Sequence, residues 1–266
     1  MLGAIIGDVV GSRFEFNNIK TKEFDLFDKS CSITDDSVMS IATAEMCLMG
    51  YVPENSAMIT ETFKKWGQRY PYAGYGDRFF GWVLSDDPRP YNSCGNGSAM
   101  RISAVGFYAR SAEEVEAYSR AVTEVTHNHP EGIKGAYVTA MCIFMARHGA
   151  SKDEIRAFAE KHYDIDFDYE QLRRNYIHGA EICQNTVPQA IFCFLISESF
   201  EDCIRTTISI GGDCDTTAAI SCAIAEAYYG IPSDIAHGVM PFIPDDMKYI
   251  IHRFYRVIDD SGITIL

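Results

Sequence analysis

The sequence predicts an all-α fold, a single domain of about ten to twelve helices with short connections. Two observations favour this class. Helix start and stop signals recur along the chain, whereas evidence for strands is thin. The 266 residues contain no linker, low-complexity segment or internal repeat, so one domain covering residues 1–266 is the simplest organisation.

The first clear helix is predicted over residues 37–49. It follows a Thr-Asp-Asp segment that can cap it, and it stops at Gly50, the residue type favoured just past a helix end. Further along the chain, Ser111 and Glu114 have the spacing of a capping box, in which the hydroxyl and the carboxylate each accept a free backbone N–H. Each pattern predicts where a helix begins.

The second half of the chain carries the same kinds of signal. Ser151 and Glu154 form another candidate capping box, and the small-residue segment 215–229 predicts a helix that ends before Gly230. Three prolines each stand at the expected start of a helical segment, where a missing N–H costs nothing: Pro130, Pro188 and Pro244.

Two segments lack a helical pattern. Residues 21–27 alternate weakly between polar and apolar side chains, and no run resembles a hairpin or a βαβ unit. Residues 66–96 are rich in Tyr, Gly, Pro and Asp and predict a long irregular loop, a composition found in functional and inert loops alike.

Charge and cysteine content limit which binding partners and which cellular compartment we expect. The 37 acidic and 23 basic side chains give a net charge of −14 without a Lys/Arg block, which disfavours long nucleic acid and anionic membrane as partners. Nine cysteines occur without a CxxC pair, mostly in apolar runs, and the N-terminal segment does not resemble a signal peptide. We therefore expect free thiols, a cytoplasmic location and no membrane span.

Two acidic clusters stand where helices are expected to begin. They are Thr34-Asp35-Asp36 and the segment from Gly211 to Thr217, which includes Asp213, Asp215 and Thr216. One interpretation is helix capping, because carboxylates and hydroxyls accept orphan N–H groups. The other is a divalent metal site, because paired carboxylates with threonine hydroxyls supply more hard oxygen than a cap requires. The spacing leaves both open.

A glycine-containing loop, residues 94–101, leads into a helical run. Its backbone amides could bind an anion, although an ordinary Asn-Gly turn is the simpler explanation of this segment alone, and it lacks the GK[ST] ending of a P-loop. Residues 127–132 place two histidines and a glutamate before a helix. Their spacing does not match the HExxH motif of helical zinc sites, which disfavours zinc binding. The remaining interpretations are that one histidine contacts a ligand or that the segment is a purely structural turn.

Taken in order, these segments resemble the ADP-ribosylglycohydrolase family. The matching stretches span the chain nearly end to end: Gly3 to Asp8 with Gly11 and Glu15, Thr34 to Asp36, Gly95 to Arg101, His127 to Gly132, and Gly211 to Thr216. Any one of these is weak alone, whereas five in family order are specific.

The resemblance implies a single compact all-α globule of orthogonally packed helices with a binuclear Mg²⁺ or Mn²⁺ centre in a cleft. It assigns metal ligation to Thr34, Asp35, Asp36, Asp213, Asp215 and Thr216, with catalysis by Glu15, Asp35 and Asp36. It assigns substrate contacts to Gly95, Asn96, Gly97, Ser98, Met100, Arg101 and His129. Asp77, Asp86 and Asp87 are candidates for a further catalytic acid, and Cys214 is expected to fill space rather than bind metal.

The activity implied by the resemblance is metal-dependent hydrolysis of the bond between ADP-ribose and an acceptor, which releases ADP-ribose. The acceptor, an ADP-ribosylated protein side chain or a small ADP-ribosyl conjugate, is not determined by these motifs. A non-catalytic ADP-ribose-binding or structural protein and a two-metal nucleotide phosphohydrolase are the alternatives. We expect a monomer by default.

Overall fold

The computed structural model describes residues 1–50, 53, 55–177 and 181–258. These residues form helices α1–α15 and one 3-10 helix, and the only β-pairing among them is an isolated antiparallel bridge between Gly95 and Ile182. The all-α prediction is confirmed, although the described helices outnumber the ten to twelve expected. Part of the predicted domain, residues 259–266, lies outside the described residues.

The first eight helices are α1 (Leu2–Gly11), α2 (Asp35–Leu48), α3 (Ser56–Arg69), α4 (Asp77–Leu84), α5 (Gly97–Met100), α6 (Ser103–Tyr108), α7 (Ala112–Glu124) and α8 (Pro130–Arg147). The others are α9 (Lys152–Ala159), α10 (Tyr169–Asn175), α11 (Cys183–Ile196), α12 (Phe200–Ile210), α13 (Cys214–Tyr229), α14 (Ser233–Val239), the 3-10 helix η1 (Met240–Phe242) and α15 (Asp245–Ile258).

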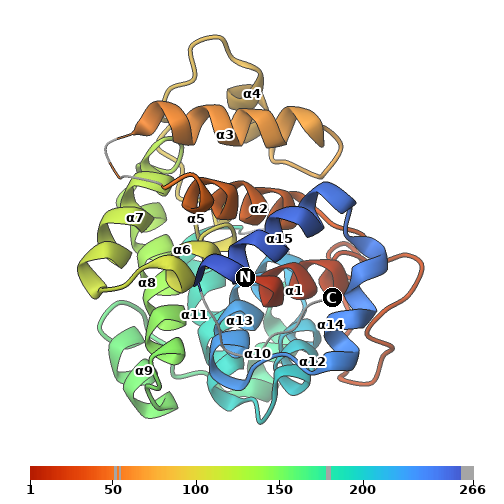
Figure 1. Cartoon of the computed structure of the whole chain (residues 1–266). Helices are drawn as coiled ribbons and strands as arrows, with labels where there is room; N and C mark the ends of the chain where they lie inside the picture. Colours follow the sequence, from red (N-terminus) through yellow and green to blue (C-terminus); the bar gives the residue numbers. More distant parts are fainter. Residues whose placement is uncertain (51–52, 54, 178–180, 259–266) are drawn as a thin grey trace.

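Helices α1 and α13 lie at the centre of the molecule, surrounded by the other helices (Figure 1). Every residue of α1 is buried, as expected for a helix that is apolar on nearly all sides. Gly3, Gly7 and Gly11 recur every fourth residue along α1, and a Cβ added at any of them would come within 3.0 Å of the α13 backbone. The glycines therefore allow direct backbone contact between two helices from opposite ends of the chain.

Helix boundaries follow the predicted signals to within two residues at the two acidic clusters. Helix α2 starts at Asp35, earlier than the predicted residue 37, because the Thr34 side chain accepts the Asp36 N–H at 3.3 Å and caps the helix. Helix α13 ends before Gly230, which has the positive φ of 74° that glycine tolerates.

The capping predictions were partly wrong. Ser151 and Glu154 form the complete box, but at Ser111 only half of it exists, because the Glu114 carboxylate accepts the N–H of Arg110 instead. Pro130 occupies the first turn of α8 and Pro244 directly precedes α15, as predicted.

Pro188, in contrast, lies inside α11 rather than at its start. The helix extends toward its N-terminus through Cys183, a segment whose residues are largely buried, so packing outweighs the missing hydrogen bond.

The segment predicted to be irregular contains ordered helix. Residues 66–96 include the end of α3 and the whole of α4, whose Phe79, Trp82 and Val83 are buried. The glycines and prolines around α4 obscured this short amphipathic pattern. Residues 21–27 form no strand. Among the described helices, none has the length and apolar character needed to span a bilayer.

Candidate metal centre

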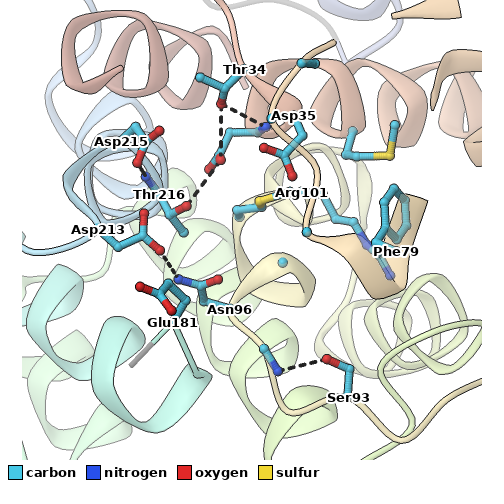
Figure 2. Close-up of a pocket in the computed structure, with 18 of the residues that line it drawn as sticks. Thr34, Asp35, Phe79, Ser93, Asn96, Arg101, Glu181, Asp213, Asp215 and Thr216 are labelled. Atoms are coloured by element: carbon cyan, nitrogen blue, oxygen red, sulfur yellow. Dashed lines mark hydrogen bonds between the residues drawn. The ribbon is translucent and has the colours of Figure 1, made fainter. Parts of the chain in front are cut away.

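A cavity of about 480 Å³ opens where the N-terminal ends of α2 and α13 meet. Its lining also includes residues of α4 and of the loop that leads into α5. Both helix starts carry carboxylates, which the positive end of each helix dipole stabilises. Figure 2 shows Thr34 and Asp35 facing Asp213, Asp215 and Thr216 across this space, so the fold brings together the two acidic clusters that are far apart in sequence.

Two groups of three carboxylates could hold a metal ion. Asp8, Asp36 and Asp215 form one group, and Glu15, Asp213 and Asp215 form the other, with one oxygen from each member lying within 4.8 Å of the others. Asp215 belongs to both groups. Hard carboxylate oxygens are the donors that Mg²⁺, Mn²⁺ and Ca²⁺ prefer.

Asp36 supplies the test of whether these residues fit a metal. Its Oδ2 accepts a hydrogen bond from the Thr216 hydroxyl at 3.2 Å, whereas its buried Oδ1 has no hydrogen-bond partner in the described part of the chain. A buried carboxylate oxygen without a partner is costly unless a cation compensates it. The donor set therefore fits a divalent ion.

Burial and mutual repulsion raise the pKa of the acidic side chains. Burial, together with the charges of Asp8 and Asp213, raises the pKa of Asp35 to about 8. The pKa values of Asp36 and Asp215 are also well above the usual range, first because of burial and then because of neighbouring carboxylates. Because these pKa values are raised, proton binding and cation binding compete at this cluster.

Asp8 is a member of the cluster that our sequence reasoning missed. Its carboxylate accepts the backbone N–H and hydroxyl of Thr34 at 2.9 and 2.7 Å, and the N–H of Ser37 at 3.0 Å together with the Ser37 hydroxyl. Three of these four bonds go to Oδ2 and only the Thr34 hydroxyl donates to Oδ1, so Oδ1 retains acceptor capacity for a cation. Asp8 consequently fixes the start of α2 from its position on α1.

Asp35 and Thr34 lie at the cavity but outside both carboxylate groups. The Asp35 backbone N–H donates to the Ala73 carbonyl oxygen at 2.7 Å, which holds the segment before α4 against the acidic side of the cavity. Cys214 is buried, and its thiol contacts the Gly11 carbonyl oxygen at 3.7 Å. It contacts the backbone of α1, in agreement with a space-filling role.

The loop before α5 connects to the acidic cluster through Asn96. The amide Nδ2 of this side chain donates to Asp213 at 2.6 Å and to the Thr186 hydroxyl at 3.1 Å (Figure 2). The predicted contact residues that line the cavity are Gly95, Asn96, Gly97, Met100 and Arg101. Ser98 instead turns inward and donates its hydroxyl to the Gly132 carbonyl oxygen at 2.8 Å.

Arg101 lines the cavity but directs its guanidinium group into the protein. Its Nη2 donates to the Val122 carbonyl oxygen at 3.1 Å and to the Thr126 hydroxyl at 2.7 Å. The guanidinium carbon lies 4.3 Å from the centre of the Phe63 ring and 5.8 Å from that of Phe79. The direct substrate contact predicted for this guanidinium has no support in this geometry.

The structure places the two histidines differently from the prediction, which assigned the substrate contact to His129. His129 caps α8, with its Nδ1 accepting the Glu131 N–H at 3.1 Å, and it is absent from the cavity lining. His127 lines the cavity and is 5% exposed. The choice between them required knowledge of which residue begins the helix, because a helix cap turns its side chain back onto the backbone.

A further acidic residue at the cavity is Glu181, whose carbonyl oxygen accepts the Asn96 N–H at 3.1 Å and which is labelled near Asn96 in Figure 2. No local motif marks it in the sequence. Of the three acids considered earlier, Asp77 lines the cavity, whereas Asp86 and Asp87 do not.

Comparisons with known proteins show which proteins this chain resembles in sequence and in fold. The mouse (Mus musculus) ADP-ribosylhydrolase ARH3 is 25% identical over 307 residues, covering 87% of this chain and 83% of the relative. The Rhodospirillum rubrum ADP-ribosyl-(dinitrogen reductase) glycohydrolase is 26% identical over 273 residues, covering 93% and 89%. A solved structure described as an ADP-ribosylglycohydrolase-related protein complex shares the fold, with a TM-score of 0.70 at 21% identity over 97% of this chain and 96% of that chain.

The family model for ADP-ribosylglycohydrolase matches residues 1–262, nearly the whole chain. This protein therefore belongs to the ADP-ribosylglycohydrolase family.

Proposed function

We propose that this protein hydrolyses the glycosidic bond between ADP-ribose and an acceptor in a divalent-metal-dependent reaction. The observation that carries the proposal is the pair of carboxylate groups sharing Asp215 at a cavity large enough for a nucleotide-sized ligand. Both relatives named above are ADP-ribosyl hydrolases.

The metal-holding residues in this proposal are those of the two acidic clusters. Asp36, Asp213 and Asp215 present carboxylates to the cavity, with Asp35, Thr34 and Thr216 beside them. Two Mg²⁺ or Mn²⁺ ions are the cofactors we propose. Divalent ions held here would supply positive charge and Lewis acidity near the reacting sugar.

Glu15 is the residue that we propose moves a proton in the reaction. It lines the cavity, and one of its carboxylate oxygens lies within 4.8 Å of oxygens of Asp213 and Asp215. A carboxylate in such a position can transfer a proton to or from a water molecule or the leaving group, which contributes about 10²–10⁴-fold to the rate.

In this proposal, the remaining wall of the cavity binds the substrate and orients it. Gly95 and Gly97 leave the backbone accessible, and Asn96 ties their loop to Asp213. We propose that this loop contacts the phosphates or a ribose of ADP-ribose. Holding the sugar against Glu15 converts a bimolecular reaction into an effectively unimolecular one.

The experiment uses the purified full chain, treated with EDTA and then supplied with Mg²⁺ or Mn²⁺. A panel of substrates carries ADP-ribose on arginine, serine, cysteine, a nucleic-acid base or a small acyl group, and chromatography identifies the products. We expect free ADP-ribose from at least one linkage only when metal is present. Glu15→Gln should lose turnover while retaining ADP-ribose binding.

Asp86→Asn is the matched control, because Asp86 is exposed and outside the cavity lining. It should retain wild-type activity. Tight ADP-ribose binding without turnover of any linkage would identify a non-catalytic protein, and release of phosphate would identify a phosphohydrolase. The same panel determines the acceptor, and sedimentation tests the proposed monomer.

A further inference from the structure

A buried chain of hydrogen bonds runs from Arg101 through Thr126 to His127 at the cavity wall. The Arg101 Nη2 lies 2.7 Å from the Thr126 hydroxyl oxygen, and this oxygen lies 2.7 Å from Nδ1 of His127. Arg101 is 1% exposed and Thr126 is fully buried, so water does not compete for these groups.

The donors and acceptors that each side chain carries determine which group donates in each of these hydrogen bonds. A guanidinium group only donates, so the Thr126 oxygen accepts from Arg101. The single hydroxyl proton of Thr126 then has two acceptors within reach, the Thr123 carbonyl oxygen at 3.5 Å and His127 Nδ1 at 2.7 Å. The shorter contact has normal hydrogen-bond length, which favours donation of the Thr126 proton to Nδ1 over donation to the Thr123 carbonyl oxygen. In this arrangement Nδ1 is an acceptor and carries no hydrogen.

The surroundings of His127 keep the ring neutral. Burial, followed by the positive charges of Arg101 and Arg78, lowers its pKa well below the usual value. The Tyr91 ring packs beside it, with 5.9 Å between ring centroids. A neutral imidazole without a proton on Nδ1 has its proton on Nε2.

The Nε2 atom faces the glycine loop of the cavity. A Cβ at Gly97 would lie 3.3 Å from it, and a Cβ at Gly95 would lie 3.6 Å away. Within the described residues, Nε2 makes no hydrogen bond. The glycines thus leave open the space in front of a ring nitrogen whose partner the protein does not supply.

We infer that Arg101 and Thr126 are positioning residues that hold His127 in the tautomer with its proton on Nε2, and so present an uncharged N–H donor to the cavity. The hydrogen-bond relay stands on the protein alone. The identity of the acceptor, a phosphate or ribose oxygen of ADP-ribose, rests on the proposed function.

The test reads the tautomer directly. Long-range ¹H–¹⁵N spectra of the ¹⁵N-labelled full chain distinguish protonated from unprotonated ring nitrogens, and the signals missing from His127→Gln assign His127. We expect Nε2 protonated and Nδ1 unprotonated in the wild type. Thr126→Val, which has a similar shape but no hydroxyl, should lose this preference, whereas Thr126→Ser should retain it.

A second experiment measures the affinity of the same variants for ADP-ribose. Loss of one oriented hydrogen bond should weaken binding of Thr126→Val by about fivefold to tenfold, with Thr126→Ser close to the wild type. Arg101→Lys should show an intermediate tautomer preference, because lysine keeps the charge but not the planar donor geometry.

Two outcomes would overturn the inference: a wild-type His127 protonated on Nδ1, or a Thr126→Val spectrum identical to that of the wild type. Failure of the wild type to bind ADP-ribose would reject the proposed function instead, and would leave the tautomer result intact.

Discussion

At the residue scale, Asp215 is the side chain on which both carboxylate groups depend. Asp215→Asn should abolish metal-dependent turnover and most metal binding, because each group loses one of its three carboxylates. Titration calorimetry with Mn²⁺ measures the binding. In thermal unfolding, the wild type should gain about 2.7 kcal/mol at a metal concentration about 100 times Kd, and the variant should gain little.

Without metal, the variant should be at least as stable as the wild type. Removing a buried charge relieves repulsion, so metal-free Asp215→Asn should unfold at the same temperature as the metal-free wild type or above it. Asp234→Asn, on the exposed side of α14, is the control and should behave as the wild type in both states. A variant that still gained full stability from Mn²⁺ would remove Asp215 from the metal site.

The acidic cluster also predicts a dependence on pH. Its aspartates have folded-state pKa values above the 3.8 of a free aspartate, to about 8 for Asp35. A group with a raised folded pKa favours the folded state fully below its unfolded pKa, and this contribution is lost as pH rises through the folded pKa.

Metal-free wild type should therefore lose stability relative to metal-free Asp215→Asn as pH rises above 3.8, the pKa of a free aspartate, toward the raised folded-state pKa of Asp215. Denaturant unfolding of both proteins at a series of pH values measures the difference, and the comparison cancels groups common to both. Stabilisation of the wild type by Mn²⁺ should grow over the same range, because fewer protons must be displaced. A difference that shrank with rising pH would contradict the raised pKa values.

The positions of site residues were predictable where a motif placed several oxygen donors together. The Thr-Asp-Asp and Gly-Asp-Cys-Asp-Thr segments mark helix starts, and the fold brings their carboxylates to one cavity. Asp8 was missed as a site residue because it stands alone among apolar residues, and its partner Thr34 is distant in sequence. His127 was passed over for His129 because only the observed cap shows which ring turns away.

At the element scale, the contact between α1 and α13 sets the positions of the acidic side chains. Gly7→Ala should destabilise the protein by about 1–3 kcal/mol, because the new methyl group would overlap the α13 backbone at Ala218. The same displacement should separate Asp8 from Asp215 and weaken Mn²⁺ binding. Chemical denaturation and calorimetry measure the two effects.

Gly81→Ala is the matched control for this prediction. Gly81 lies inside α4, and a Cβ there meets no atom within 4 Å. Alanine should stabilise that helix by about 0.5–1 kcal/mol without changing Mn²⁺ affinity. If Gly7→Ala proved as harmless as Gly81→Ala, the two central helices would not be in backbone contact.

Helix ends were predictable from local chemistry, and helix interiors less so. The Thr34 cap and Gly230 correspond to simple rules, whereas α11 continues past Pro188 and α4 forms within a segment rich in helix-breaking residues. In both exceptions buried apolar side chains outweigh local preference, and burial depends on neighbours that one sequence segment does not contain.

At the scale of the whole molecule, the net charge of −14 is distributed unevenly. Glu15, Asp35, Asp36, Asp213 and Asp215 all line one cavity, and Asp8 lies behind them. The all-α class followed from the recurrence of helix signals, but nothing local showed that the first and last thirds of the chain share a core. The paired arrangement of α1 and α13 requires contacts that only the folded chain makes (Figure 1).

The same central pairing has a consequence for the order of folding. Asp36 and Thr216 are hydrogen-bonded although they stand 180 positions apart, and the Gly3 N–H donates to Glu226 across 223 positions. Contacts between such distant segments form late, because closing a long loop costs entropy before any contact repays it.

The metal site should accordingly be absent from the folding transition state. Stopped-flow measurements should show that Mn²⁺ leaves the refolding rate unchanged and slows unfolding, whereas faster refolding with Mn²⁺ would indicate that the helices meet early. A cation that arrives after the rate-limiting step would lengthen the lifetime of the folded state without guiding the chain toward it, so its contribution to durability would be kinetic.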